Sequence, residues 1–104
     1  MIVTNEPGYY EPGKYGIRIE NILVCIQDEN GLLGFENITI CPYDKNLIDV
    51  QLLSEQDKIF INKYHEKVWD ILSPRIQDDA ETLEWLKNAT SALWLNPNFI
   101  IKYL

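Results

Sequence analysis

Two Pro-Gly pairs near the start of the chain, Pro7-Gly8 and Pro12-Gly13, mark turns in the first sixteen residues, as does Gly16. Residues 17–27 then give a strand signal, and their later part is apolar on both faces, which is typical of a strand buried on both sides. A turn at residues 28–31 separates this strand from a second one, predicted over 32–41. The first part of the chain is therefore predicted to form antiparallel strands.

The second half of the chain carries signals for two helices. Ser54 is a suitable N-cap, followed by acidic residues in the first turn, where the helix dipole favours negative charge. Pro74 is expected to end this helix, and Asp78 or Asp79 to cap a second one. The predicted fold class is α+β, with antiparallel strands followed by a helical hairpin. Apolar side chains expected to pack between the helices are Phe60 or Ile61, Tyr64, Val68, Ile71 and Leu72 in the first, and Leu83, Leu86 and Leu93 in the second.

Charge and cysteine usage narrow the range of partners. The formal net charge of −7 argues against a nucleic-acid partner, because phosphate binding requires clustered Lys and Arg. No apolar run reaches the roughly 18 residues of a membrane-spanning helix, so no membrane partner is expected. Cys25 and Cys41 lie far apart on predicted strands, which favours free thiols in a cytoplasmic protein over a disulfide framework.

Glu6 and Glu20 lie at equal distances along the chain from Gly13. In an antiparallel hairpin that turns at Pro12-Gly13 they oppose each other, with Cβ atoms about 4.5–5.5 Å apart. Two carboxylates so close repel each other unless a proton or cation lies between them, and paired Mn²⁺ or Mg²⁺ ions in oxygen-rich sites are common in hydrolases. Arg18 shares a face with Glu20 and is placed to orient a carboxylate. Spacing alone favours a plainer alternative, in which two ordinary glutamates and a salt bridge to Arg18 lie on a surface hairpin.

The residues around both glutamates resemble the last catalytic motifs of the aminopeptidase P family, which are the Xaa-Pro aminopeptidases of the pita-bread (M24) metallopeptidases. These motifs are Thr-Asn-Glu-Pro-Gly-Tyr-Tyr at 4–10 and Gly-Ile-Arg-Ile-Glu-Asn at 16–21. The resemblance implies that Glu6 and Glu20 are ligands of two divalent metal ions, expected to be Mn²⁺, with Glu20 bridging both. It also implies catalytic roles for Glu6, as a proton acceptor, and for Arg18, as a support of the metal centre.

The resemblance extends into the second half of the chain, through residues 35–42, 47–49 and Tyr64-His65. It implies that residues 1–41 are the terminal strands of the metallopeptidase domain. Residues 42–104 then correspond to a C-terminal helical extension associated with dimer formation, so a homodimer is expected. Residues 94–104 match nothing in the family and are interpreted as a lineage-specific tail.

The family's metal centre also needs aspartates and histidines that come earlier in the chain. No Asp or His precedes Glu6, and the single histidine, His65, lies on a predicted helix, where a packing or surface role is favoured over a role as metal ligand. We therefore expect this chain to be inactive alone, Met1 to be an internal boundary, and the full-length enzyme to act on peptides with proline in second position. Two alternatives are a non-catalytic dimerisation module and a pita-bread homologue that has lost catalysis. A substrate pocket and simple packing both remain open for Tyr9, Tyr10 and Tyr15.

Overall fold

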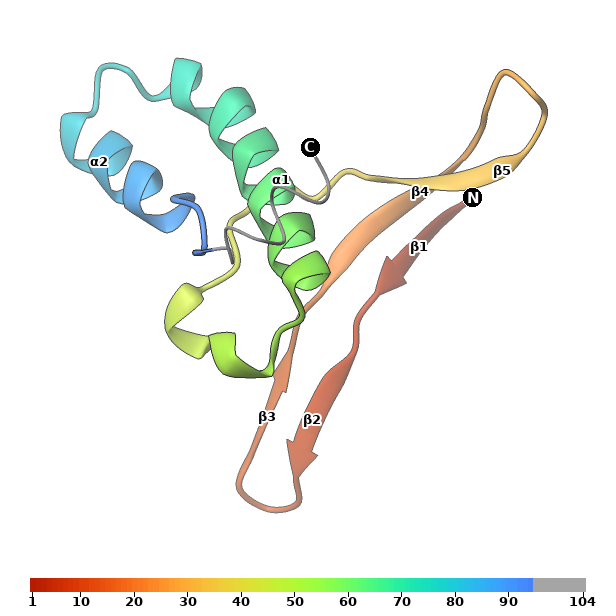
Figure 1. Ribbon diagram of the computed structural model, residues 1–104, viewed down its shortest axis with the longest axis horizontal. Helices are drawn as coiled ribbons and strands as arrows, with labels where there is room; N and C mark the ends of the chain where they lie inside the picture. The colour runs from red at the N-terminus through yellow and green to blue at the C-terminus, as the bar shows by residue number, and fades with distance from the viewer. Residues whose placement is uncertain (95–104) are drawn as a thin grey trace. The chain divides into compact units, whose positions relative to one another are not determined.

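The computed structural model describes residues 1–94, and the chain divides into two compact units that follow each other at Thr39 and Ile40 (Figure 1). The first unit consists of the strands β1 (Ile2–Asn5), β2 (Gly8–Glu11), β3 (Tyr15–Arg18), β4 (Asn21–Gln27) and β5 (Leu33–Asn37). The second contains the helices α1 (Glu55–Leu72) and α2 (Ala80–Ala89), with 3-10 turns at Lys45–Leu47, Val50–Leu52 and Ser73–Arg75. This order confirms the predicted α+β class.

The first unit is built around one long antiparallel hairpin. β2 pairs with β3, and β1 pairs with β4, which also pairs with β5 to give the order β1-β4-β5. The pair Asn5↔Asn21 ends one ladder, and three positions further along both strands Gly8↔Arg18 begins the other. The two ladders therefore share one register. Gly13, with φ of 72°, supplies the left-handed conformation that the turn requires.

The predicted strand over residues 17–27 is wrong in one respect, because β3 ends at Arg18 and β4 begins only at Asn21. The gap lies opposite Pro7, which has no N–H to donate to a ladder. Its carbonyl oxygen still accepts from the Ile19 N–H at 3.1 Å, so the two chains stay together. β2, in a segment predicted only as turns, forms because it faces β3 across the same hairpin.

The strand predicted over residues 32–41 ends at Asn37. Beyond that point the Ile38 N–H still donates to the Ile22 carbonyl at 3.0 Å, and side chains then take over from the backbone ladder. The Thr39 hydroxyl accepts from the Ile22 N–H at 2.7 Å, and the Asn37 side-chain oxygen accepts from the Thr39 N–H at 3.0 Å. Because these oxygens satisfy the backbone donors, the chain can leave the sheet without losing hydrogen bonds.

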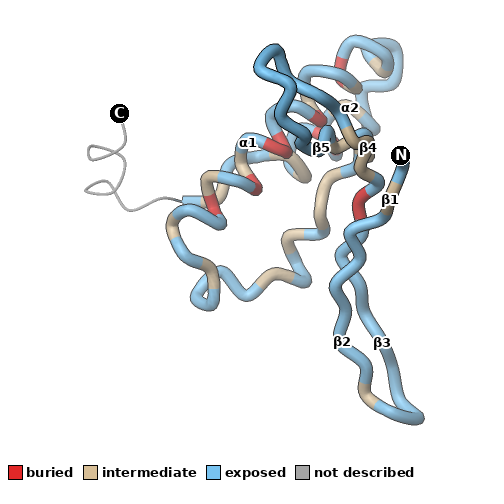
Figure 2. The backbone as a smooth tube through the Cα atoms, turned by 90° about the vertical axis from the view of Figure 1, so that its right-hand side faces the viewer, coloured by how far each residue is buried: buried red, intermediate tan, exposed pale blue. Residues whose placement is uncertain are grey.

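The expectation that β4 is buried on both faces is also wrong. Ile22 and Ile26 are 40% and 43% exposed, and Asn21 is the one buried residue of this strand (Figure 2). β4 is central in its sheet, so its backbone has partners on both edges. Pairing at the edges does not cover the faces, and it is the faces that an apolar strand must bury.

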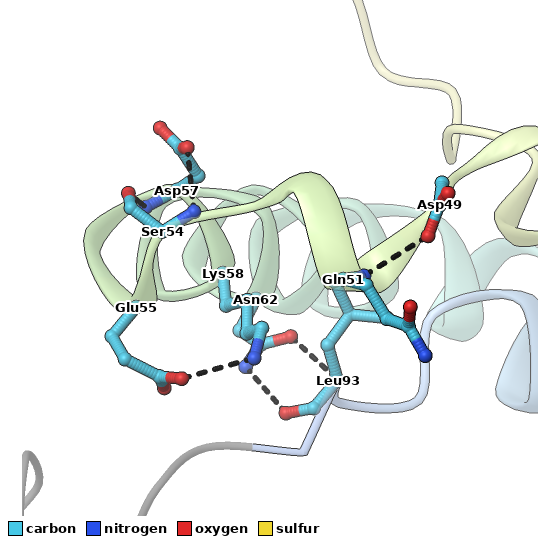
Figure 3. A network of polar contacts seen from close by, with 8 residues as sticks. All are labelled: Asp49, Gln51, Ser54, Glu55, Asp57, Lys58, Asn62 and Leu93. Carbon is cyan, nitrogen blue, oxygen red and sulfur yellow. Dashed lines mark hydrogen bonds and ion pairs between the residues drawn. The ribbon is translucent and has the colours of Figure 1, made fainter.

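The second unit follows the predicted helix signals closely. Ser54 and Asp57 form a capping box at the start of α1, with reciprocal bonds of 3.0 Å, as Figure 3 shows. α1 ends one residue before a 3-10 turn that contains Pro74, and Asp79 caps α2. The core consists of Tyr64, Val68 and Leu86, with Ile40, Tyr43, Trp69, Leu72 and Ile76 packed against it.

Two side chains fasten the ends of this unit. The amide of Asn62 donates to the Leu93 carbonyl at 3.1 Å and accepts from the Leu93 N–H at 2.7 Å (Figure 3). The ammonium of Lys45 donates to the carbonyls of Asn88 and Ser91, at the C-terminal end of α2, where positive charge is favoured. Of the two alternatives on α1, Ile61 is buried and Phe60 is 63% exposed.

None of the helices within residues 1–94 combines the length and the apolar character that crossing a membrane requires. Most of the predicted tail, residues 95–104, lies outside the described residues.

Candidate functional site

Glu6 and Glu20 lie where the two ladders of the long hairpin meet. The shared register places residue 6 opposite residue 20, which confirms the predicted pairing of positions. Both side chains are exposed in this chain, and the Thr4 hydroxyl donates to Oε2 of Glu6 at 3.1 Å. Thr4 was not singled out by the sequence. Neither glutamate belongs to a regular strand. Both lie in the stretch of the hairpin between the β1–β4 ladder and the β2–β3 ladder.

Arg18 has a partner that sequence reasoning missed. Its Nε donates to the hydroxyl of Tyr10 at 2.9 Å, and its guanidinium carbon lies 5.8 Å from the centre of the Tyr10 ring. The hydrogen bond that Arg18 donates to Tyr10 is the main cause of a raised pKa of Arg18, and the negative charges of Glu6 and Glu20 raise it further. Within residues 1–94 Arg18 forms no salt bridge with either glutamate, in contrast to the plainer alternative.

The Tyr10 ring lies across the hairpin because two glycines leave room for it. A Cβ atom on Gly16 would come within 2.8 Å of Cδ1 of Tyr10, and one on Gly8 within 2.8 Å of its hydroxyl. Tyr10 pairs directly with Gly16 in the β2–β3 register. The sequence could have indicated the position of the Tyr10 ring, because a glycine opposite an aromatic residue leaves an open surface on which the ring can lie. Tyr9 and Tyr15 form a separate ring contact, at 6.1 Å between centroids.

The chemistry of this site is that of a carboxylate pair beside a fixed positive charge. Oxygen ligands of this kind suit hard divalent ions such as Mn²⁺ and Mg²⁺. Among the described residues, however, no three His, Cys, Asp or Glu side chains form a group that could hold a metal ion. Glu6 and Glu20 have the ligand chemistry of an oxygen-rich metal centre, and such a centre would need further ligands beyond the described residues of this chain.

His65 lies in the helical unit and is fully buried, as the expectation of a packing role implied. Its Nε2 accepts from the Tyr43 N–H at 3.0 Å, and its ring lies 5.8 Å from those of Tyr43 and Tyr64. Burial lowers the pKa of His65, and the positive charge of Lys45 lowers it further. A ring nitrogen already engaged with the backbone is not available as a metal ligand.

Comparison with known proteins gives a consistent result. Residues 31–93 match the family model described as the C-terminal region of peptidase M24, a range that begins after both glutamates. Over 100 residues the chain is 48% identical to the probable Xaa-Pro aminopeptidase P of Coprinopsis cinerea and 48% identical to that of Laccaria bicolor. Each alignment covers 89% of this chain and 16% of the relative.

A solved structure agrees with these relatives. The X-prolyl aminopeptidase of Caenorhabditis elegans, described as a cytosolic enzyme with a di-nuclear active site, superposes with a TM-score of 0.76 at 30% identity. The match covers 88% of this chain and 16% of that one. The resemblance inferred from the motifs is confirmed, and the chain spans about one sixth of the length of these proteins.

Proposed function

Because the chain belongs to the peptidase M24 family, by its C-terminal region, we propose that it is the C-terminal part of a metal-dependent aminopeptidase. The reaction is removal of the N-terminal residue from peptides with proline in second position. The observation that carries this proposal is the hairpin register, which sets Glu6 opposite Glu20 in a chain whose relatives are named Xaa-Pro aminopeptidases.

In the whole enzyme, Glu6 and Glu20 would donate carboxylate oxygens to two divalent metal ions, for which Mn²⁺ is our expectation. The description of the C. elegans neighbour as having a di-nuclear active site supports the number of ions. Such a pair supplies Lewis acidity and makes water nucleophilic at neutral pH. Glu6 would also accept a proton, and Thr4, which donates to one of its oxygens, would hold the carboxylate in place.

Arg18 would support this centre from behind the carboxylates. Its charge offsets the repulsion between two glutamates, and the Tyr10 hydroxyl and ring hold the guanidinium in position. Residues of this kind orient ligands, and their loss commonly lowers metal affinity or activity by about 10–100-fold. Two carboxylates do not make a complete centre, so we propose that this chain is inactive alone.

We also propose a cytoplasmic location, a peptide substrate and a homodimer formed through the helical unit. The C. elegans neighbour is described as cytosolic, which supports the location. Phe60 on α1 and Trp85 on α2 are 63% and 60% exposed, which supports an apolar contact between copies. Sedimentation velocity tests the dimer, and a monomer at every concentration would contradict it.

A hybrid enzyme tests the activity. The chain replaces the matching C-terminal segment of the C. cinerea relative, and cleavage of an Xaa-Pro peptide is measured with added Mn²⁺. We expect activity that falls by more than about 100-fold in Glu20→Gln, beyond the range usual for residues outside the metal's own ligands. The matched control is Glu29→Gln, which neutralises a glutamate in the β4–β5 turn and should leave kcat/KM unchanged.

Metal content and thermal melting of each hybrid separate the outcomes. Near-wild-type turnover in Glu20→Gln would overturn the assignment of the metal ligand. A hybrid that folds and binds metal but does not cleave would instead favour the homologue that has lost catalysis. A hybrid that folds without binding metal would favour the non-catalytic dimerisation module.

A further inference from the structure

The helical unit holds a titratable side chain that the proposed function does not use. His65 is 0% exposed, on the face of α1 that packs against residues 41–43. Its Nε2 accepts from the Tyr43 N–H, so the proton of the neutral ring resides on Nδ1. Nδ1 is itself buried and has no hydrogen-bond partner among the described residues. An aliphatic side chain in this position would not bury an unpaired donor. The property that an imidazole adds is its ability to take up a proton.

A second proton on His65 reverses the contact with Tyr43. Nε2 would change from an acceptor into a donor, and two N–H groups would then face each other at hydrogen-bond distance. Within residues 1–94 no carboxylate forms an ion pair with His65 that would stabilise the imidazolium. The rings of Tyr43 and Tyr64 flank it, each with its centroid 5.8 Å from that of the imidazole. The charge that acts on His65 within residues 1–94 is the ammonium of Lys45, which is also positive.

The contact lies where the chain enters the second unit. The first unit ends at Thr39, and side chains of α1 hydrogen-bond the segment that follows. Tyr64 donates to the Cys41 carbonyl at 2.6 Å and accepts from the Cys41 N–H at 3.3 Å, and His65 accepts from Tyr43. The bond to the Tyr43 N–H involves an imidazole, whose ordinary pKa lies between pH 5 and 8.

We propose that His65 is an acid-sensitive latch within the second unit, in which protonation of Nε2 breaks its hydrogen bond with the Tyr43 N–H and favours opening of the segment around Tyr43. Burial lowers the pKa of His65, and Lys45 lowers it further, so the closed state resists the proton. Once the segment opens, the imidazole regains a pKa near 6.5. Between these two pKa values the open population rises about tenfold for each pH unit of acidification.

Hydrogen exchange of backbone amides, followed by NMR on the whole chain, tests this inference. The Tyr43 amide reports the latch, and the Val68 amide, in the fully buried core of α1, reports global unfolding. We expect lower protection at the Tyr43 amide than at the Val68 amide, because the latch opens without global unfolding. Between about pH 6.5 and the lower pKa of the folded state, protection of the Tyr43 amide should fall by about tenfold per pH unit, and that of Val68 with the same slope, because His65 takes up its proton in the open and in the unfolded state alike. The matched variant is His65→Gln, whose side-chain oxygen can accept from Tyr43 but does not titrate, so its Tyr43 protection should not change with pH.

Three results would overturn the latch. One is a Tyr43 amide with the same protection factor as Val68 at every pH, since the segment would then open only by global unfolding. Another is the same pH dependence in His65→Gln. The third needs no substitution: direct NMR titration of His65 in the unaltered chain should give a pKa below 6.5, and a value at or above 6.5 refutes the inference.

Discussion

Removal of one oxygen atom, in Tyr64→Phe, should destabilise the helical unit by about 1–2 kcal/mol, since it breaks two hydrogen bonds of which the longer is weak. The hydroxyl donates to the Cys41 carbonyl at 2.6 Å and accepts from the Cys41 N–H at 3.3 Å. The phenylalanine ring can keep the contact with Tyr43, whose centroid lies 4.7 Å away, so packing is retained. The side chain is 6% exposed, which limits replacement of its bonds by water.

Urea denaturation followed by tryptophan fluorescence measures this effect in the right unit, because Trp69, Trp85 and Trp94 all follow residue 40. A loss of 1–2 kcal/mol corresponds to a melting temperature lower by roughly 5–15 °C in a unit of this size. Tyr15→Phe is the matched control, since Tyr15 is 61% exposed in the first unit and its change should stay within about 0.5 kcal/mol. A change in Tyr64→Phe that is no larger than in this control would refute the anchoring role.

Three further predictions concern the same unit. Ser54→Ala removes the capping box of α1 and should cost about 1 kcal/mol in urea unfolding, most of which Ser54→Thr should restore; equal stability of the two variants would contradict the cap. Lys45→Met should raise the pKa of His65 in an NMR titration, because it removes a nearby positive charge, and a lowered pKa would contradict this. The free energy of unfolding should fall from pH 7 to pH 5, because the unfolded chain, with a His65 pKa near 6.5, takes up a proton that the folded chain resists. The range from pH 7 to pH 5 lies above the range in which Asp79 begins to titrate, because hydrogen bonds from Thr82 lower the pKa of its carboxyl group. If the free energy of unfolding falls equally over this range in His65→Gln, the assignment to His65 is contradicted.

The features that the sequence predicted well depend on neighbours a few residues away. The caps at Ser54 and Asp79 were predictable because each side chain bonds an N–H three residues further along. The opposition of Glu6 and Glu20 was predictable because Pro12-Gly13 fixes the midpoint of the hairpin. In each case a short stretch of chain holds all the information.

The features that were missed depend on contacts across the fold. The gap between β3 and β4 arises from Pro7 on the opposite side of the hairpin. Tyr10 is the partner of Arg18 because its ring lies against Gly8 and Gly16, with its hydroxyl within reach of Arg18 Nε. The exposed faces of β4 show the same limit, because an apolar pattern reports what a strand could bury and not which segment covers it.

The constant register of the long hairpin sets where the chain can vary in length. Its tip, from Pro12 to Lys14, lies beyond the last pair, Glu11↔Tyr15, so extra residues there would leave every pair in place. One residue added between the ladders would instead turn a carboxylate to the other face, because side chains alternate along a strand. In the hybrid enzyme, two glycines inserted after residue 13 should preserve cleavage, and one inserted after residue 7 should abolish it; the reverse result would contradict the register. Insertions and deletions in homologues should therefore collect at the tip and be absent beside the glutamates.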